Sequence, residues 1–241
     1  MPYRLGLQRS ARLRAIVARR CAAALFFVAA LTSEGCKEEI YYSADPITGT
    51  VVDADTKQPL AGVNVLASWT AYGGGLEGGN LTGHAMVLEA VTDENGKFSL
   101  PGWGPKRLNF SGLIRNNEPL LVLFKSGYKA QGWSNSDAMH PAPHHMQSEW
   151  NGKTLELKKF EGSADEYAQD LSLFLGSLIE SFAMPEECNL KAIPKFLLAL
   201  DQQHQEFARQ HTKINVRSVN GLSESYRRKC GSLEQYVREH G

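Results

Sequence analysis

Between residues 47 and 160, the chain consists of short runs with strand patterning, separated by residues that favour turns. In residues 63–69, side chains alternate between two faces, so that Val65 lies on one face and Leu66 on the other. The unbroken apolar run Leu120–Phe124 is typical of a strand buried on both faces. Further strands are expected at residues 47–53, 85–93, 97–100 and 153–160. Short strands joined by turns predict an antiparallel β-sandwich.

One turn between these runs has a specific signature. Asn95 and Gly96 both tolerate positive φ, a property that the tightest hairpin turns require. The pair therefore predicts a hairpin between a strand that ends near Thr92 and a strand that begins near Phe98.

The pattern changes to helical spacing near residue 161. Ser163 and Glu166 form a capping box, which predicts a helix that ends before Pro185. Its apolar stripe consists of Tyr167, Leu171, Phe174, Leu175, Leu178, Ile179 and Phe182. A second helix is expected after Asn189 and a third over residues 223–237. The stripe is expected to pack on the sandwich or on the neighbouring helices; the alternative is a helix that binds a partner.

Three ordered segments together resemble a known module: "GTVVDADTKQPLAGVNV", "VTDENGKFSLP" and "LVLFKSGY". They are similar to the carboxypeptidase regulatory-like domain, over residues 47–135 with residues 153–160 as a last strand. The resemblance implies a β-sandwich of the transthyretin (prealbumin) type, followed here by a small C-terminal α-helical unit. It also implies a structural or interaction role in bacterial envelope proteins, and it supplies no catalytic residues.

The N-terminal residues are interpreted as an export signal. Six arginines precede the apolar run Cys21–Leu31, and no acidic residue comes before Glu34. A membrane-spanning helix needs about 20 apolar residues, and this run has 11. Cleavage is therefore expected, with an uncleaved N-terminal anchor as the alternative. The expected organisation is a signal at residues 1–35, a linker at 36–46, the sandwich at 47–160 and the helical unit at 161–241.

The end of the signal resembles a bacterial lipoprotein processing site. Gly35 stands directly before Cys36, the residue that would be lipidated, whereas Ser33 and Glu34 depart from the usual pattern. Lys37 after the cysteine resembles lipoproteins sent to an outer membrane. We therefore expect a lipid anchor at Cys36, with a soluble periplasmic or secreted product as the alternative.

Charge and cysteine content narrow the classes of partner and compartment. Without residues 1–35 the chain has 20 basic and 25 acidic residues, so it offers no broad basic surface for nucleic acid. Apart from Cys36, the mature chain then contains only Cys188 and Cys230, 42 residues apart. In an oxidising compartment they most simply form a disulfide. The alternative is two separate buried thiols.

Several residues suggest binding chemistry. His140, His144 and His145 lie between two methionines, and such ligands suit copper or zinc, although two prolines favour an exposed loop. Asp53 and Asp55 suggest calcium but better fit a β-turn in which aspartate caps the backbone. A set of aromatic residues offers either a sugar-binding platform or core packing: Trp69, Tyr72, Trp103 and Trp133.

Motifs of common enzymes are missing from the sequence. The glycine-rich residues 70–84 lack the Gly-Lys-Ser/Thr ending of a phosphate-binding loop, and no histidine has a glutamate three residues later. A Gly-x-Ser-x-Gly nucleophile motif is also lacking. The sequence thus predicts a non-enzymatic cell-envelope protein without a cofactor, whose partner is a protein or a glycan. A glycan- or metal-binding module is the alternative.

Overall fold

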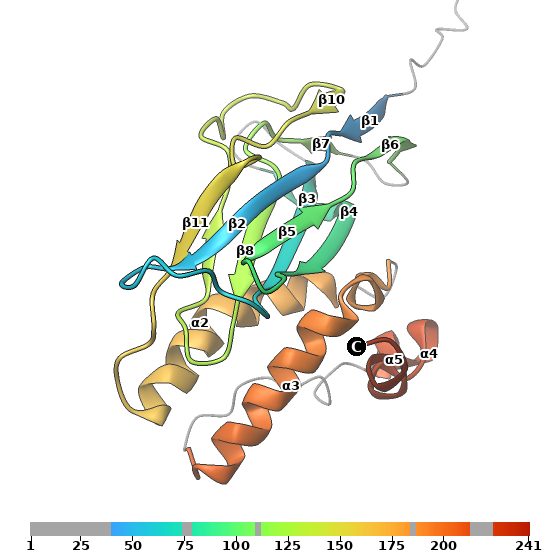
Figure 1. Ribbon diagram of the computed structural model, residues 1–241. Coiled ribbons are helices and arrows are strands. Elements are labelled where there is room, and N and C mark those ends of the chain that lie inside the picture. The colour runs from blue at the N-terminus through green and yellow to red at the C-terminus, as the bar shows by residue number, and fades with distance from the viewer. Residues whose placement is uncertain (1–39, 74–78, 109–111, 184–186, 213–223) are drawn as a thin grey trace, which may run out of the picture. The chain divides into compact units, whose positions relative to one another are not determined.

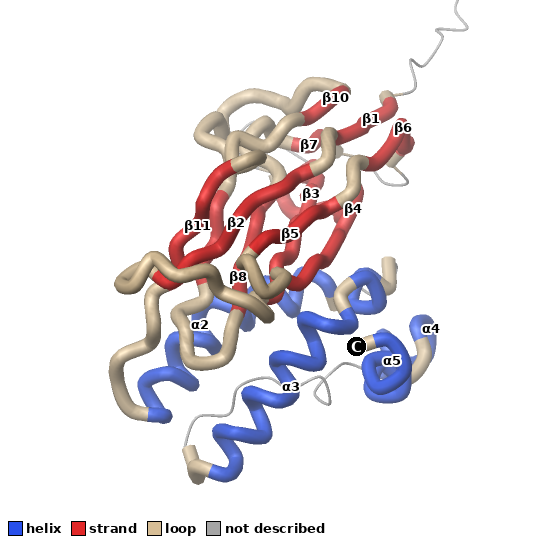
Figure 2. Tube along the Cα trace, viewed as in Figure 1, coloured by secondary structure: helices blue, strands red, loops and turns tan. Residues whose placement is uncertain are grey.

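A computed structural model describes residues 40–73, 79–108, 112–183, 187–212 and 224–241 (Figure 1). Its strands are β1 (Tyr41–Ala44), β2 (Ile47–Asp53), β3 (Asn64–Gly73), β4 (Asn80–Val91), β5 (Lys97–Leu100), β6 (Trp103–Arg107), β7 (Leu113–Ile114), β8 (Leu120–Phe124), β9 (Gln131–Trp133), β10 (His145–Met146) and β11 (Lys153–Leu157). The helices are α2 (Ala164–Phe182), the 3-10 helix η1 (Asn189–Ala192), α3 (Pro194–Arg209), α4 (Glu224–Cys230) and α5 (Leu233–His240). The described part is thus mostly β-sheet followed by helices, as the sequence predicts (Figure 2).

The strands form three sheets, ordered β10-β1-β6, β11-β2-β5 and β4-β3-β8-β9, with β7 also paired to β3. The β4-β3-β8-β9 sheet is covered on both of its faces. Leu121 and Leu123 of β8 belong to a hydrophobic cluster shared with β2, β5 and β11. Val122 and Phe124 belong to a second cluster, shared with the helices. The unbroken apolar run of β8 is therefore explained by burial on both faces, as predicted.

The turn after β4 is tight, but the two strands that it joins do not form a hairpin. The amide of Asp93 donates to the carbonyl of Lys97 at 2.9 Å, and Gly96 adopts φ +71°. However, β4 pairs with β3, whereas β5 pairs with β2 in the other sheet. The carbonyl of Gly96 accepts a hydrogen bond from Val51 at 2.7 Å, so this turn carries the chain from one sheet to the next. The hairpin prediction is wrong on this point.

Two further expectations about the sheets need correction. The pairs β11–β2 and β1–β10 are parallel, so the sheets are not wholly antiparallel. Parallel neighbours need a long connection, and about 100 residues separate the paired positions Gly49 and Lys153.

In addition, residues 41–44 form β1 and bury Tyr42 and Ala44, so they belong to a sheet rather than to the linker expected at residues 36–46.

The helices begin largely where the sequence places them. The capping box of Ser163 and Glu166 is present, and α2 ends at Phe182. Residues 189–192 form η1, and α3 begins only at Pro194, a residue that favours the first helical turn. The single helix expected over residues 223–237 is instead two helices, because Gly231 adopts φ +82° between them. Among the described helices, none is long and apolar enough to cross a membrane.

Candidate functional site

His145 lies at the start of β10 and bonds to two side chains of the neighbouring β1 segment. Its Nδ1 is 2.9 Å from Ser43 Oγ, and its Nε2 is 2.8 Å from Asp45 Oδ1. Because an ionised carboxylate only accepts, Nε2 carries the hydrogen, and in the neutral ring Nδ1 accepts from the Ser43 hydroxyl. Gln147 Nε2 donates to the other Asp45 oxygen at 2.8 Å. These contacts hold the loop before β11 against β1.

The other two histidines considered as metal ligands, in a segment expected to be an exposed loop, have different partners. His140 Nδ1 lies 3.0 Å from Asp137 Oδ2. The ring of His144 meets the ring of Tyr42 edge-on, with centroids 5.9 Å apart. Within the described residues, no group of three or more histidine, cysteine or acidic side chains is arranged to hold a metal ion. The fold therefore does not bring His140, His144 and His145 together as one set of ligands.

Asp137 and Asp53 organise turns through backbone hydrogen bonds. Hydrogen bonds from Asn116 and then from the Met139 amide lower the pKa of Asp137 to about 2. Asp53 Oδ1 accepts from the amides of Asp55 and Thr56, at 3.0 and 2.8 Å. The Thr56 hydrogen bond is the largest cause that lowers the pKa of Asp53 to about 2. The turn predicted at Asp53 is confirmed.

The four aromatic residues considered for sugar binding do not form one exposed platform. Trp69 and Trp103 are only 1% and 9% exposed, and their rings pack edge-on at 5.5 Å. Trp133 instead packs against Trp150, with ring centroids 6.3 Å apart. The guanidinium of Arg115 covers the Tyr72 ring at 4.3 Å. Core packing, which was the favoured interpretation, accounts for Trp69 and Trp103. Of the glycine-rich segment, residues 74–78 lie outside the described residues.

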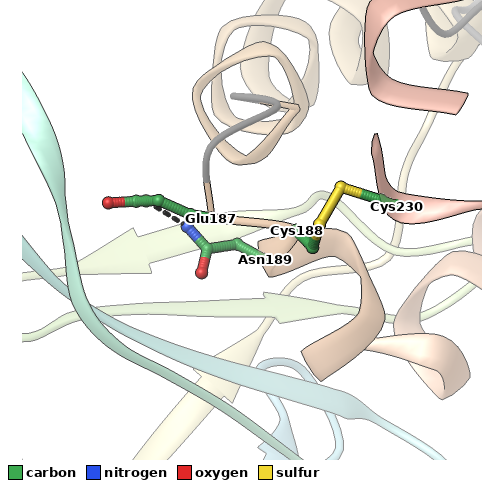
Figure 3. The surroundings of a disulfide bond; sticks show 4 residues. All are labelled: Glu187, Cys188, Asn189 and Cys230. Atoms are coloured by element: carbon green, nitrogen blue, oxygen red, sulfur yellow. Dashed lines mark hydrogen bonds between the residues drawn. A yellow bond between two sulfur atoms is a disulfide. The ribbon is translucent and has the colours of Figure 1, made fainter. Parts of the chain in front are cut away.

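The predicted disulfide is present. Cys188 and Cys230 are bonded, with their Cα atoms 5.5 Å apart, and the bond joins the start of η1 to the end of α4 (Figure 3). Beside it, the Glu187 carboxylate accepts hydrogen bonds from the Asn189 side chain and from the backbone amide of His84, the latter at 3.0 Å. The candidate lipidation residue Cys36 lies outside the described residues.

A buried histidine that no sequence motif marks links the sheet to the helices. His84, on β4, is 5% exposed, and its Nδ1 is 3.0 Å from Ser68 Oγ. Its Nε2 is 3.2 Å from the carbonyl of Ser181, near the end of α2. Burial lowers the pKa of His84, which favours the neutral ring. Both nitrogens thus have partners inside the protein, and the ring connects β3 and β4 to the end of α2.

Glu118 and Asn135 are also buried polar residues that no sequence motif marks. Glu118 is 5% exposed and accepts from the Leu120 amide at 3.1 Å; burial raises its pKa to about 7. Asn135 Nδ2 contacts the carbonyls of Asn116, Glu118 and Gln147, each at 3.0–3.1 Å. A polar residue in a loop gives no sequence signal that distinguishes such burial from exposure.

The outer face of the β11-β2-β5 sheet carries a shallow, open hollow of about 470 Å³. Thr48, Thr50, Lys97 and Ser99 are among the residues that line it. The opposite face of this sheet packs into the hydrophobic cluster shared with β3 and β8. The hollow therefore lies on a sheet face rich in hydroxyl groups.

No protein-family model matches the chain, and no curated protein matches it either. Among solved structures, it is similar to 3-chlorocatechol 1,2-dioxygenase from Rhodococcus opacus 1CP, with 17% identity over 52% of this chain and 62% of that chain, at a TM-score of 0.30. Catechol 1,2-dioxygenase from Acinetobacter sp. ADP1 gives 16% identity over 53% and 55% of the two chains, at a TM-score of 0.28. The match thus spans less than two thirds of either enzyme. TM-scores of this size assign neither a fold nor an activity to this chain.

Proposed function

We propose that the chain is an exported, non-enzymatic protein of a bacterial cell envelope, anchored by a lipid on Cys36. Its body serves a structural or protein-interaction role. The observation that carries the proposal is the bond between Cys188 and Cys230. Structural disulfides persist in oxidising compartments outside the cytoplasm. This bond therefore supports export, in agreement with the arginine-rich start and the Gly35-Cys36 junction of the sequence.

We further propose that the body is a transthyretin-like β-sandwich of the carboxypeptidase regulatory-like type. One hydrophobic cluster contains residues of both β2 and β3, which lie in different sheets. The first resembling segment spans β2, the Asp53 turn and the start of β3; the second contains the turn from β4 to β5; the third contains most of β8. The resemblance thus falls on the elements that build this cluster.

The outer face of the β11-β2-β5 sheet is the surface we propose for a protein partner. Its side chains include Thr48, Lys97 and Ser99, which line the shallow hollow. The other face of the sheet packs in the core, and the β4-β3-β8-β9 sheet has a hydrophobic cluster on each face. A photo-reactive amino acid at Ser99 should then form one discrete cross-linked product in cells, and the same probe at the exposed Gln169 of α2 should not.

Anchoring is tested by replacing Cys36 with serine and fractionating the cells that express the chain. The unaltered protein should incorporate radioactive palmitate and stay with membranes, and C36S should do neither. C188S is the matched control, because it also removes one cysteine but should still incorporate palmitate. A wild-type protein that takes up no label and appears in the soluble periplasmic fraction would refute the anchor.

A further inference from the structure

Of the seven large apolar side chains that are exposed among the described residues, four lie on segments near the start of β1, and Val91, Leu173 and Phe174 lie elsewhere. Ile40, Tyr41, Leu113 and Met139 are 39%, 45%, 44% and 88% exposed, respectively. We call these four residues the tether end. Large apolar side chains at such exposure are ordinary when scattered, but a group on one side of a protein marks an interaction surface.

Backbone pairing brings the tether end together, although its residues are distant in sequence. Strand β1, which contains Tyr41, pairs with both β6 and β10. The segment before β10 in turn bonds to β7: the Ala142 amide donates to the Ile114 carbonyl at 2.7 Å, and the Asn116 amide to the His140 carbonyl at 2.9 Å. Leu113 and Met139 therefore lie on adjoining segments, and β1, β7 and β10 occupy the same end of the described body (Figure 1).

The length of chain before β1 limits how far this end can be from a lipid on Cys36. Four peptide units join Cys36 to Ile40. An extended chain spans at most about 3.6 Å per residue, so the Cα atoms of these two residues are at most about 14 Å apart. The two polar layers together add roughly 10–15 Å to a hydrocarbon core of about 30 Å, so each layer is about 5–8 Å deep and the connection spans at most about twice that depth. A lipid anchor would therefore hold the tether end at the membrane surface.

The chemistry of the surface suits that position. Tyr41 is aromatic, and tyrosine is favoured at the headgroup level of membranes. Lys106 and Arg107 are exposed on β6, directly opposite Tyr42 and Tyr41, and the Lys106 ammonium donates to the carbonyl of Ala85 at 2.7 Å. The nearby carboxylates of Asp45 and Asp137 already contact His145 and His140. Apolar and aromatic side chains with adjacent cations are the composition of an interfacial surface.

We propose that the tether end lies against the lipid bilayer, with Ile40, Tyr41, Leu113 and Met139 in the headgroup region. This inference rests on the proposed anchoring at Cys36, and it adds a fixed orientation of the body relative to the membrane. The tether end would contact the bilayer, whereas the outer face of the β11-β2-β5 sheet remains the surface proposed for a protein partner.

The test uses the purified lipoprotein in vesicles of phosphatidylethanolamine and phosphatidylglycerol. Met139→Cys supplies one free thiol for an environment-sensitive nitrobenzoxadiazole label, because Cys188 and Cys230 are bonded and Cys36 would carry lipid. Gln202→Cys is the matched control: Gln202 is exposed on α3, which lies at the opposite end of the body from β1 and β10 (Figure 1). Leu113→Cys provides a second label within the tether end.

Labels at residues 139 and 113 should show blue-shifted emission and should lose emission when the vesicles contain doxyl-labelled lipid. The label at residue 202 should do neither. If the protein floats with the vesicles but all three labels behave alike, the inference is overturned and anchoring stands. A label at 139 that is shielded from aqueous iodide but untouched by doxyl lipid would indicate a protein partner and would also overturn it. A protein that carries no acyl chain and does not float refutes the anchoring proposal itself.

Discussion

The carboxylate of Glu89, on strand β4, accepts a hydrogen bond at 3.0 Å from the backbone amide of Phe196, in the first turn of α3. A second bond, from the Lys195 amide, measures 3.1 Å. A carboxylate is favourable at a helix N-terminus because it satisfies free amides and opposes the positive end of the helix dipole. Ile193, which precedes the helix, provides no side-chain cap. The sheet therefore supplies the cap that the helix lacks.

Glu89→Ala is expected to lower the free energy of unfolding by about 1 kcal/mol, the usual cost of losing a helix cap. Glu89→Gln should lower it less, because the amide oxygen still accepts a hydrogen bond. Urea denaturation followed by circular dichroism measures both effects. Glu94→Ala, in the exposed turn after β4, is the control and should leave stability nearly unchanged. Equal stabilities of the two alanine variants would contradict a capping role.

The disulfide is expected to contribute about 3–4 kcal/mol, since the bridged positions are 42 residues apart and the bond restricts the unfolded chain. Replacing Cys188 and Cys230 together with serine should lower the denaturation midpoint accordingly. Reductant should lower the denaturation midpoint of the C36S protein, which retains the disulfide. It should not lower the midpoint of the variant in which Cys36, Cys188 and Cys230 are all replaced with serine. Two free thiols per C36S chain in an Ellman assay of denatured, unreduced protein would disprove the bond.

Glu118 is expected to make stability fall as the pH rises from about 4.5 to 7. Burial raises its pKa from 4.5 to about 7, so the folded state binds more protons than the unfolded state in this window. The stability that protonation provides is complete below the unfolded pKa and is lost as the pH approaches the folded pKa. The loss is on the order of 3 kcal/mol, at about 1.4 kcal/mol per pKa unit.

Glu118→Gln removes this titration and should flatten the pH dependence of the denaturation midpoint between pH 4.5 and 7. Glu161→Gln, an exposed residue before α2, serves as the control and should retain the wild-type slope. A variant slope that matches the wild type at every pH would show that Glu118 does not titrate in this range.

Asn135 holds three loops together, and its side-chain amide is the donor to all three carbonyls. Asn135→Asp keeps the shape but replaces the donor with a negatively charged acceptor beside these oxygens. We expect a loss of at least about 2 kcal/mol, because buried carbonyls lose their partner. Asn95→Ala, in the exposed turn before β5, should change stability little. Thermal unfolding of both variants provides the comparison.

The helices and strands were predictable where a local residue pattern is compatible with only one kind of burial or one helix start. The run Leu120–Phe124 could only be a strand covered on both faces, and the Ser163 capping box sets the start of α2 within its own four residues. Alternation in β5 shows that Phe98 and Leu100 face a core, but it does not say which sheet they join. That choice depends on the close approach of Gly96 to Val51, a contact between distant parts of the chain.

The surroundings of the candidate site residues were less predictable, because they too depend on contacts between distant parts of the chain. His84 is buried because the end of α2, about 100 residues later, covers its face of β4. His140, His144 and His145 are neighbours in sequence, yet each is oriented by a different partner: Asp137, Tyr42 or Asp45. Closeness in sequence therefore suggested a shared ligand set that the fold does not assemble. The disulfide was predictable because so few cysteines were available to pair.

The parallel pairing of β2 with β11 determines when the β11-β2-β5 sheet can be completed. Gly49 must pair with Lys153, so this contact has a high sequence separation and a large entropic cost of loop closure. A chain that is synthesised or threaded N-terminus first exposes β2 long before β11 becomes available. During that interval the edge of β2 that later pairs with β11 lacks its partner strand. An unpaired strand edge makes the incomplete chain prone to aggregate. The β11-β2-β5 sheet is complete only after Leu157, the last residue of β11, has been synthesised.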